Sequence, residues 1–282
     1  GEFTKRALVN GKMDLTEVEG LADLISSETK QQKTQSIKLL KGELSKKYID
    51  WRQKLIETRA EMEALIDFSD EGDVSQKADN FNFIKNISNL IKNIEKELLA
   101  GMAGERLRRG ITIVLIGPPN VGKSSLINTF LNEDRAIVSS SPGTTRDAIE
   151  ARLNLEGVPV TIYDTAGIRD TKNEIEKEGV QRAIKVAQNA DIILSIGAPS
   201  PSKALRSLDT SEYKFSRIVK VYNKADLIEN KDCHKGEGYS ISCKTKKGIK
   251  RLIEGLSKEV KGMTSVSDMA VAPNRIRHMS HL

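Results

Sequence analysis

Hydrophobic positions recur at helical spacing through the first 110 or so residues of this 282-residue chain, a stretch that contains no proline. The first clear apolar stripe consists of Leu15, Val18, Leu21, Leu24 and Ile25. Thr16 followed by Glu19 has the spacing of a capping box. Together these positions predict an amphipathic helix that begins near residue 15.

Two longer stripes follow on either side of a polar segment, residues 68–80, which contains a glycine and predicts a turn. The first stripe is Leu44, Tyr48, Trp51, Leu55, Thr58, Met62 and Leu65, and the second is Ile84, Ile87, Ile91, Ile94 and Leu98. Steps of three and four residues are typical of helices that pack on other helices. We therefore expect an antiparallel helical hairpin whose two stripes face each other.

From residue 111 the pattern changes to short apolar runs separated by helical stretches. The runs ITIVLIG, VPVTIY, DIILSI and IVKVY begin at Ile111, Val158, Asp191 and Ile218. Such runs are typical of buried parallel strands. A last amphipathic helix is predicted from Ile249, Leu252, Ile253, Leu256 and Val260, ending at Gly262. This alternation predicts an α/β domain with a mostly parallel sheet, attached to an all-α helical domain.

The amino-acid composition excludes only a few classes of protein. The chain has 45 Lys and Arg against 39 Asp and Glu, a net charge of +6, which is compatible with an acidic partner such as nucleic acid. The two cysteines, Cys233 and Cys243, exclude a disulfide framework. No run of about 18 apolar residues and no signal peptide is present, so we expect a cytoplasmic protein without a membrane span. The first residue is Gly1, which suggests a piece of a longer protein.

The segment Gly117–Ser124, GPPNVGKS, matches the phosphate-binding pattern G-x-x-x-x-G-K-S between a predicted strand and a predicted helix. Backbone N–H groups of such a loop surround phosphates at a helix N-terminus. Lys123 is expected to reach the β- and γ-phosphates, and the Ser124 hydroxyl is expected to ligate Mg²⁺. The pattern predicts a P-loop nucleotide site.

Three further segments indicate that the nucleotide is GTP. Asp164-Thr165-Ala166-Gly167 follows one predicted strand, where a metal-associated Asp and a γ-phosphate-sensing Gly are needed. Asn223-Lys224-Ala225-Asp226 follows another strand and resembles the guanine-recognition element of GTPases. Ser242-Cys243-Lys244 has the spacing of the element whose backbone N–H binds guanine O6, with Cys where Ala is commoner. We therefore expect a Ras-like GTPase domain.

The segment between the P-loop and DTAG suggests how hydrolysis is organised. Thr145, in GTTRD, is the expected second Mg²⁺ ligand, with Thr144 beside it. Ras-type GTPases place a water-orienting Gln directly after DxxG, but Ile168 stands there and cannot activate water. Arg146 and Arg169 are candidate internal arginine fingers. Catalysis is otherwise expected to depend on another residue, a cation or a partner.

The motifs GPPNVGKSSLIN, SSSPGTTRD, DTAGIRD and NKADL together resemble the TrmE–Era–EngA group of bacterial GTPases. Within that group, GEFTKRALVNGKMDLTEVEGLADLI resembles the segment before the helical domain of the MnmE (TrmE) family, GTPases of tRNA wobble-uridine (U34) modification. The resemblance implies a remnant of a folate-binding domain over residues 1–13 and helical-domain halves over 14–110 and 263–282. The GTPase domain would span residues 111–262.

The resemblance also implies specific roles for residues of this chain. A K⁺ ion would be bound by Asn120, Ser139, Ser141 and Thr144, and would take the place of an arginine finger. Glu176 would be the catalytic acid, with Glu174 and Glu178 as neighbouring alternatives, and Lys12 would contact a one-carbon folate. The nucleotide-binding set would be Asn120, Val121, Gly122, Lys123, Ser124, Ser125, Ser139, Thr144, Thr145, Asp164, Thr165, Ala166, Gly167, Asn223, Lys224, Ala225, Asp226, Ser242, Cys243 and Lys244.

Relative to the family pattern, most of the N-terminal folate-binding, dimerising domain and the C-terminal Cys-x-Gly-Lys end are missing from this sequence. The resemblance favours a GTP-hydrolysing component of tRNA modification that acts with an FAD-dependent partner to add a carboxymethylaminomethyl-type group. The alternative is an Era- or EngA-like ribosome-assembly GTPase that binds rRNA, although no KH-type pattern follows residue 262. A decayed, non-functional product is a third possibility.

Overall fold

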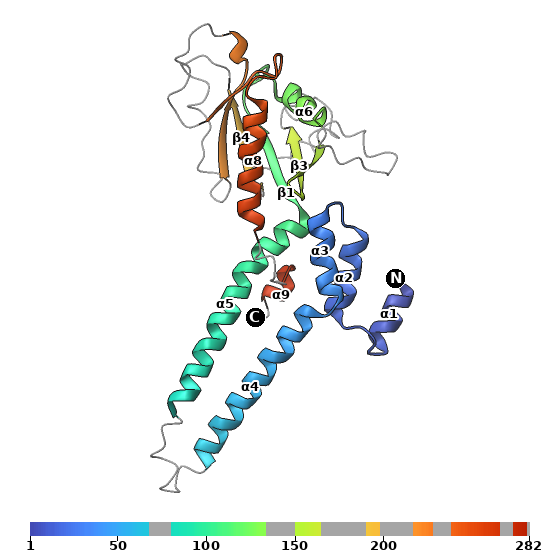
Figure 1. The fold of residues 1–282 in the computed structure, drawn as a ribbon, viewed down its shortest axis with the longest axis vertical. Helices are drawn as coiled ribbons and strands as arrows, with labels where there is room; N and C mark the ends of the chain where they lie inside the picture. Colours follow the sequence, from blue (N-terminus) through green and yellow to red (C-terminus); the bar gives the residue numbers. More distant parts are fainter. Residues whose placement is uncertain are drawn as a thin grey trace, which may run out of the picture. The chain divides into compact units, whose positions relative to one another are not determined.

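The computed structural model describes residues 1–67, 80–133, 150–164, 190–197, 217–227, 238–265 and 273–280. It divides into two compact units (Figure 1). Gly1–Arg108 with Thr264–Leu282 form the helical unit, and Arg109–Met263 form the sheet unit.

The helical unit contains α1 (Glu2–Val9), α2 (Leu15–Ile25), α3 (Lys30–Leu40), α4 (Glu43–Asp67), α5 (Asn80–Arg109, whose last residue belongs to the sheet unit) and α9 (Ile276–Ser280). The capping box of α2 lies two residues before the predicted one. Asp14 accepts from the backbone N–H of Glu17, whose side chain accepts from Asp14 N–H in return. The expectation of Thr16 and Glu19 was wrong because Thr16 lies inside the helix and donates its hydroxyl to Asp14.

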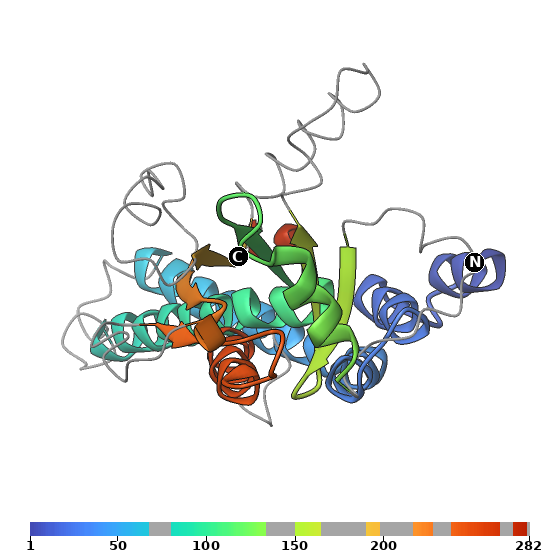
Figure 2. The same ribbon diagram turned by 90° about the horizontal axis from the view of Figure 1, so that it is seen from above.

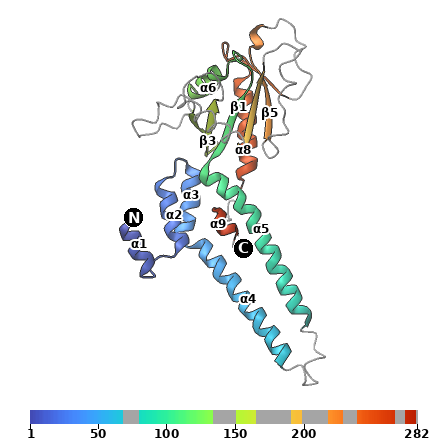
Figure 3. The same ribbon diagram turned by 180° about the vertical axis from the view of Figure 1, so that it is seen from behind.

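Helices α4 and α5 form a hairpin, but not through the predicted apolar stripes (Figure 3). Leu55 and Met62 of α4, and Ile84 and Ile91 of α5, are exposed. The space between the helices is a groove of about 360 Å³ lined by Lys54, Glu57, Thr58, Glu61, Asn86, Asn89, Leu90 and Asn93. Lys47 of α4 pairs with Glu97 of α5 at 2.6 Å. The predicted seam was therefore wrong for these four positions, whereas Leu44, Trp51 and Thr58 of the α4 stripe are buried as predicted.

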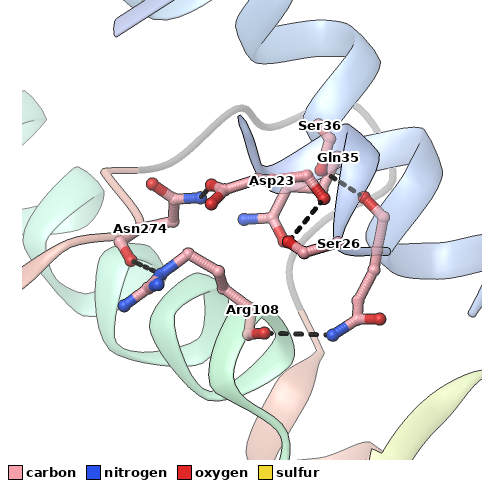
Figure 4. A pocket seen from close by; sticks show the side chains of 7 residues that line it. Asp23, Ser26, Gln35, Ser36, Arg108 and Asn274 are labelled. Carbon is pink, nitrogen blue, oxygen red and sulfur yellow. Dashed lines mark hydrogen bonds between the residues drawn. The ribbon is translucent and has the colours of Figure 1, made fainter. Parts of the chain in front are cut away.

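Hydrogen bonds of polar side chains connect α2, α3, α5 and the segment before α9 (Figure 4). Gln32 of α3 donates to the backbone carbonyls of Leu107 and Arg108, and Arg108 donates to the carbonyl of Asn274. Asn274 in turn donates to Asp23 of α2. A cavity of about 20 Å³, the size of one water molecule, lies among these groups. The network fixes both chain segments that border the sheet unit to α2 and α3.

The described strands of the sheet unit are β1 (Ile111–Ile116), β2 (Glu150–Leu155), β3 (Val158–Asp164), β4 (Ile192–Gly197), β5 (Arg217–Tyr222) and β6 (Tyr239–Ser240). They form one sheet in the order β2-β3-β1-β4-β5-β6. Only the β2–β3 pair is antiparallel. The expected mostly parallel α/β fold is confirmed, whereas the edge strands β2 and β6 were not predicted.

Two helices, α6 (Lys123–Leu131) and α8 (Ile249–Thr264), lie on the same side of this sheet (Figure 2). Phe130 of α6 and Ile253 and Leu256 of α8 line one small apolar cavity together with residues of β2 and β3. The five apolar positions predicted for α8 are all buried, although the helix continues two residues beyond Gly262. No helix in the described ranges is long and apolar enough to cross a membrane.

Candidate functional site

The P-loop lies between β1 and α6, where two glycines permit close backbone approaches. A Cβ at Gly117 would lie 2.1 Å from the carbonyl oxygen of Ile196, and one at Gly122 would lie 2.3 Å from Nδ2 of Asn223. Gly122 also has a φ of +95°, a conformation that L side chains rarely adopt. No larger residue fits either position without displacing β4 or Asn223.

Lys123, the first residue of α6, is folded back over this loop and is only 5% exposed. Its Nζ donates to the carbonyl oxygens of Gly117 and Pro118, at 2.9 and 2.8 Å. A primary ammonium group surrounded by loop carbonyls at a helix N-terminus creates a local positive charge suited to phosphate. The neighbouring Asn120 is exposed and has a φ of +61°.

Ser124 and Asp164 join the start of α6 to the end of β3. The Ser124 hydroxyl donates to Asp164 Oδ2 at 2.8 Å, and Asp164 is 5% exposed. A hydroxyl and a carboxylate oxygen in contact are hard ligands of the kind that Mg²⁺ prefers. The contact brings the last residue of β3, where the DTAG segment begins, to the start of α6.

Asn223, at the end of β5, connects three segments that are distant in sequence. Its Nδ2 donates to the carbonyl of Val121 in the P-loop at 2.8 Å, and its Oδ1 accepts from the backbone N–H of Cys243 at 3.2 Å. The side chain is buried, with 3% exposed, so both bonds are shielded from water. Asn223 thus holds the P-loop, the NKAD segment and the SCK segment together.

Asp226, in contrast, is exposed at the rim of the site. Ser242 donates a short hydrogen bond to Asp226 Oδ1, and this bond holds the pKa of the Asp226 carboxyl below its usual value. The Ser242 hydroxyl also accepts from the backbone N–H of Thr245. An oriented, ionised carboxylate open to solvent can accept two hydrogen bonds from a planar ligand edge such as that of guanine.

Cys243 lies beside this carboxylate and packs towards α6. Its thiol contacts the side chains of Thr129 and Asn223, and burial raises its pKa. Thr129 was not among the predicted residues, and no signal in the sequence marks it, because only the packing of α6 against the SCK turn brings it to Cys243. The thiol is therefore a packed, protonated group at neutral pH.

The sheet unit thus brings together the predicted residues of the P-loop, NKAD and SCK segments with Asp164. Lys12 is exposed and belongs to the helical unit. The other predicted residues lie outside the described ranges: Ser139, Ser141, Thr144, Thr145, Arg146, Thr165, Ala166, Gly167, Ile168, Arg169, Glu174, Glu176 and Glu178. Within the described ranges, no cluster of three or more His, Cys, Asp or Glu side chains could hold a metal ion.

Comparison with known proteins places these observations in a family. The tRNA modification GTPase MnmE of Bradyrhizobium sp. is 42% identical over 256 residues, which are 91% of this chain and 57% of that protein. The MnmE protein of Maricaulis maris is 41% identical over 280 residues, 99% of this chain and 62% of that protein. The chain therefore spans roughly three fifths of the length of these relatives.

Solved structures with related chains include Era of Aquifex aeolicus bound to GDP and AlF₄⁻, which is 26% identical and covers 52% of this chain and 56% of that one, with a TM-score of 0.39. The family described as the MnmE helical domain matches residues 15–282. Because that match covers nearly the whole sequence, the chain belongs to the MnmE family.

Proposed function

We propose that this chain binds and hydrolyses GTP as part of a tRNA modification GTPase that acts on wobble uridine. The observation that carries the proposal is the Asn223 side chain, which joins a P-loop to a guanine-type recognition segment. Relatives named as tRNA modification GTPases support the assignment of the substrate. The match to the family over residues 15–282 favours this function over ribosome assembly.

In this proposal, Asp226 accepts from the N1–H and 2-amino group of guanine, and adenine offers no equivalent pair of donors. The hydrogen bond from Ser242 orients the carboxylate before the nucleotide arrives. The backbone N–H groups of the P-loop and the Lys123 ammonium group would bind the phosphates. A site built to hydrogen-bond particular groups rejects analogues that lack them by roughly 10⁴-fold.

Mg²⁺ fits the hydroxyl and carboxylate oxygens of Ser124 and Asp164, and Thr145 would complete the set. A bound Mg²⁺ neutralises charge that develops on the phosphates. K⁺ fits the neutral amide oxygen of Asn120, with Ser139, Ser141 and Thr144 as further candidates. K⁺ held there would supply positive charge to the phosphates. Glu176 would position the attacking water, and Lys12 would contact folate.

The remaining parts of the proposal concern the longer family protein. An FAD-dependent partner would act with the GTPase to add the carboxymethylaminomethyl-type group, and the family's N-terminal domain would form the homodimer. The reaction would take place in the cytoplasm, where its tRNA substrate lies.

Titration with fluorescent mant-GDP and mant-ADP tests the nucleotide assignment. We expect GDP to bind at least about 10³-fold more tightly than ADP. Asp226→Asn should weaken guanine binding and improve xanthine binding, because the amide can donate where the carboxylate accepted. Lys123→Ala should weaken both purine nucleotides alike. Equal affinities for GDP and ADP in the unsubstituted chain would refute the proposed function.

A further inference from the structure

Basic side chains gather on one surface of the sheet unit, along α8 and the turn before it. Residues 244–261 contain seven Lys or Arg and two Glu, a net charge of +5, whereas the whole chain carries +6. The basic strip is defined here as Lys246, Lys247, Lys250, Arg251, Lys258 and Lys261, all of them exposed. Nearly all of the chain's excess positive charge is therefore concentrated in one helix and its preceding turn.

Helix α4 differs from the basic strip in the balance and pairing of its charged side chains. It carries five bases and six acids and pairs them along its own surface, as in Lys54 with Asp50 at 2.6 Å and Arg59 with Glu63 at 2.9 Å. No residue of the basic strip forms an ion pair with another residue in the described part of the chain. Of the two acids nearby, Glu259 pairs with Arg217 of β5, which leaves Glu254 as the carboxylate within the strip.

The strip is rigid and has a defined length. The opposite face of α8 is anchored in the core by Ile249, Leu252, Leu256 and Val260, each no more than 2% exposed. Residues 250, 251, 254, 258 and 261 follow the helical repeat and share one side of α8. From Lys250 to Lys261 the helical part of the strip is about 16 Å long at 1.5 Å per residue. A row of fixed, unpaired charges of this length suits a polyanion with regularly spaced charges.

The residue composition of the basic strip indicates which class of polyanion it binds. The apolar face of α8 is already buried, so it cannot insert into a lipid surface as an interfacial helix does. Residues 241–264 contain no aromatic residue on which single-stranded bases could stack. Lysine is depleted at protein–protein interfaces, whereas lysine contacts to phosphate are the usual source of sequence-independent nucleic-acid affinity.

We infer that the basic strip binds the phosphate backbone of a double-helical RNA segment without reading its sequence. The inference rests on the proposed function only in taking RNA, rather than DNA, as the polyanion. It adds a contact surface on the sheet unit to a proposal that otherwise names tRNA only as the substrate. The strip leaves out Lys244 and so shares no residue with the proposed nucleotide-binding set.

Fluorescence anisotropy with a labelled tRNA transcript tests this inference in the 282-residue chain. Replacing Lys247, Lys250 and Lys258 together by Gln should weaken binding by about 100-fold near 0.1 M salt and lower the salt slope by about 2 to 3. The matched control replaces Lys30, Lys33 and Lys41, exposed lysines of the helical unit, with the same loss of charge. The control should change affinity by less than about threefold.

A substitution that removes a negative charge from the strip should have the opposite effect on RNA affinity. Glu254→Gln removes the carboxylate within the strip and should strengthen RNA binding about three- to tenfold, whereas Glu61→Gln on α4 should not. Equal losses in the two lysine variants, or no gain with Glu254→Gln, would overturn the inference. So would equal competition by single-stranded oligo(U), or a stronger effect of the substitutions on binding to phosphatidylglycerol vesicles. Mant-GDP affinity, measured on the same samples, should stay unchanged and reports separately on the proposed function.

Discussion

The Ser124 hydroxyl donates to the Asp164 carboxylate at 2.8 Å, although the two residues are 40 positions apart in sequence. This contact joins the first turn of α6 to the end of β3 and brings together two oxygens suited to Mg²⁺. Asp164→Asn keeps the shape of the side chain but removes its charge. We expect the apparent Mg²⁺ affinity of the GTP complex to fall by about 10- to 100-fold. A Mg²⁺ titration of mant-GTP binding measures this change.

Asp191→Asn is the matched control, because Asp191 is another buried carboxylate of the sheet unit. Asp191 pairs with Arg109 at 2.7 Å and accepts from the backbone N–H of Thr112, so its role is in the fold. This variant should lower thermal stability without changing the Mg²⁺ dependence. If both variants moved the Mg²⁺ midpoint equally, Asp164 would have no special part in the metal site.

Glu176 remains a prediction from the sequence, since it lies outside the described residues. Positioned acid–base groups contribute roughly 10²- to 10⁴-fold to rate, so Glu176→Ala should lower kcat for GTP hydrolysis by that factor. Nucleotide affinity, measured with mant-GTP, should barely change. Glu174→Ala and Glu178→Ala are the controls. If Glu176→Ala hydrolysed GTP at the normal rate and one of these control variants were inactive, the residue replaced in that control would be the catalytic acid.

We expect GTP hydrolysis to depend on potassium, because Ile168 stands where Ras-type GTPases have a water-orienting glutamine. An arginine finger contributes about 10³- to 10⁵-fold to rate, so a site without one needs another positive charge. We expect GTP hydrolysis to be at least about tenfold faster in KCl than in NaCl at equal ionic strength. Asn120→Ala or Asn120→Lys should abolish the difference. Equal rates in both salts, with nucleotide bound, would contradict the mechanism and leave nucleotide binding untouched.

His278 makes the stability of the helical unit sensitive to pH. Its Nε2 lies 2.8 Å from Oε2 of Glu19, and its side chain is 6% exposed. Burial lowers the pKa of His278 below 6.5, outweighing the opposite effect of Glu19. Below pH 6.5 the unfolded chain therefore binds a proton that the folded chain does not, and the free energy of unfolding falls as pH drops.

Denaturant unfolding of the unsubstituted chain and of His278→Gln at pH 8.5, 7.5 and 5.5 measures this effect. The unsubstituted chain should lose stability between pH 7.5 and 5.5, by at most about 1.4 kcal/mol, because only one pH unit of this range lies below 6.5. His278→Gln should show a smaller loss. Between pH 8.5 and 7.5 the ring is neutral in both states and contributes no change. An identical pH dependence in the two proteins would show that His278 is not the titrating group.

Gly20 of α2 permits the close packing of α2 on α3. A Cβ at Gly20 would lie 2.6 Å from the backbone nitrogen of Leu40 and 2.9 Å from the Cβ of Leu39. Gly20→Ala should therefore destabilise the helical unit by about 1 to 3 kcal/mol, measured by thermal unfolding. Gly262 of α8 has nothing within 4 Å of its Cβ position, so Gly262→Ala should be stabilising by up to about 1 kcal/mol. Equal effects of the two substitutions would rule out the steric explanation for Gly20.

The recognition segments could be located from sequence because each is short and contiguous. GPPNVGKS and NKAD each follow a predicted strand, and parallel strands bring their carboxyl ends to one edge of a sheet. SCK was located by its spacing, because the short strand β6 before it was not predicted. Helices and the parallel strands were likewise visible, since a repeat of 3.6 residues or an unbroken apolar run is a local property. The edge strand β2 carries a different signal, the strict polar–apolar alternation of EARLNL, which buries Ala151, Leu153 and Leu155. A prediction made from continuous apolar runs does not detect such a strand.

Which face of each helix is buried was decided only by tertiary structure. The predicted stripe of α4 placed both Leu55 and Thr58 inside, yet only Thr58 is buried, with 7% exposed, whereas Leu55 is 53% exposed. Thr58 tolerates burial because its hydroxyl donates to the backbone carbonyl of Lys54. Periodicity shows that a helix has an apolar side, but the burial of that side depends on elements that pack against it from elsewhere in the chain.

At the nucleotide site, too, local sequence and tertiary structure determined different features. The sequence by itself determined that a P-loop and a guanine-type segment are present, because their functions depend on residue types at fixed local spacing. Only the fold decided that Asn223 joins Val121 to Cys243 and that Ser242 orients Asp226. Those bonds connect residues 16 to 102 positions apart, and hydrogen bonds between such distant groups form only when the sheet brings the strand ends together.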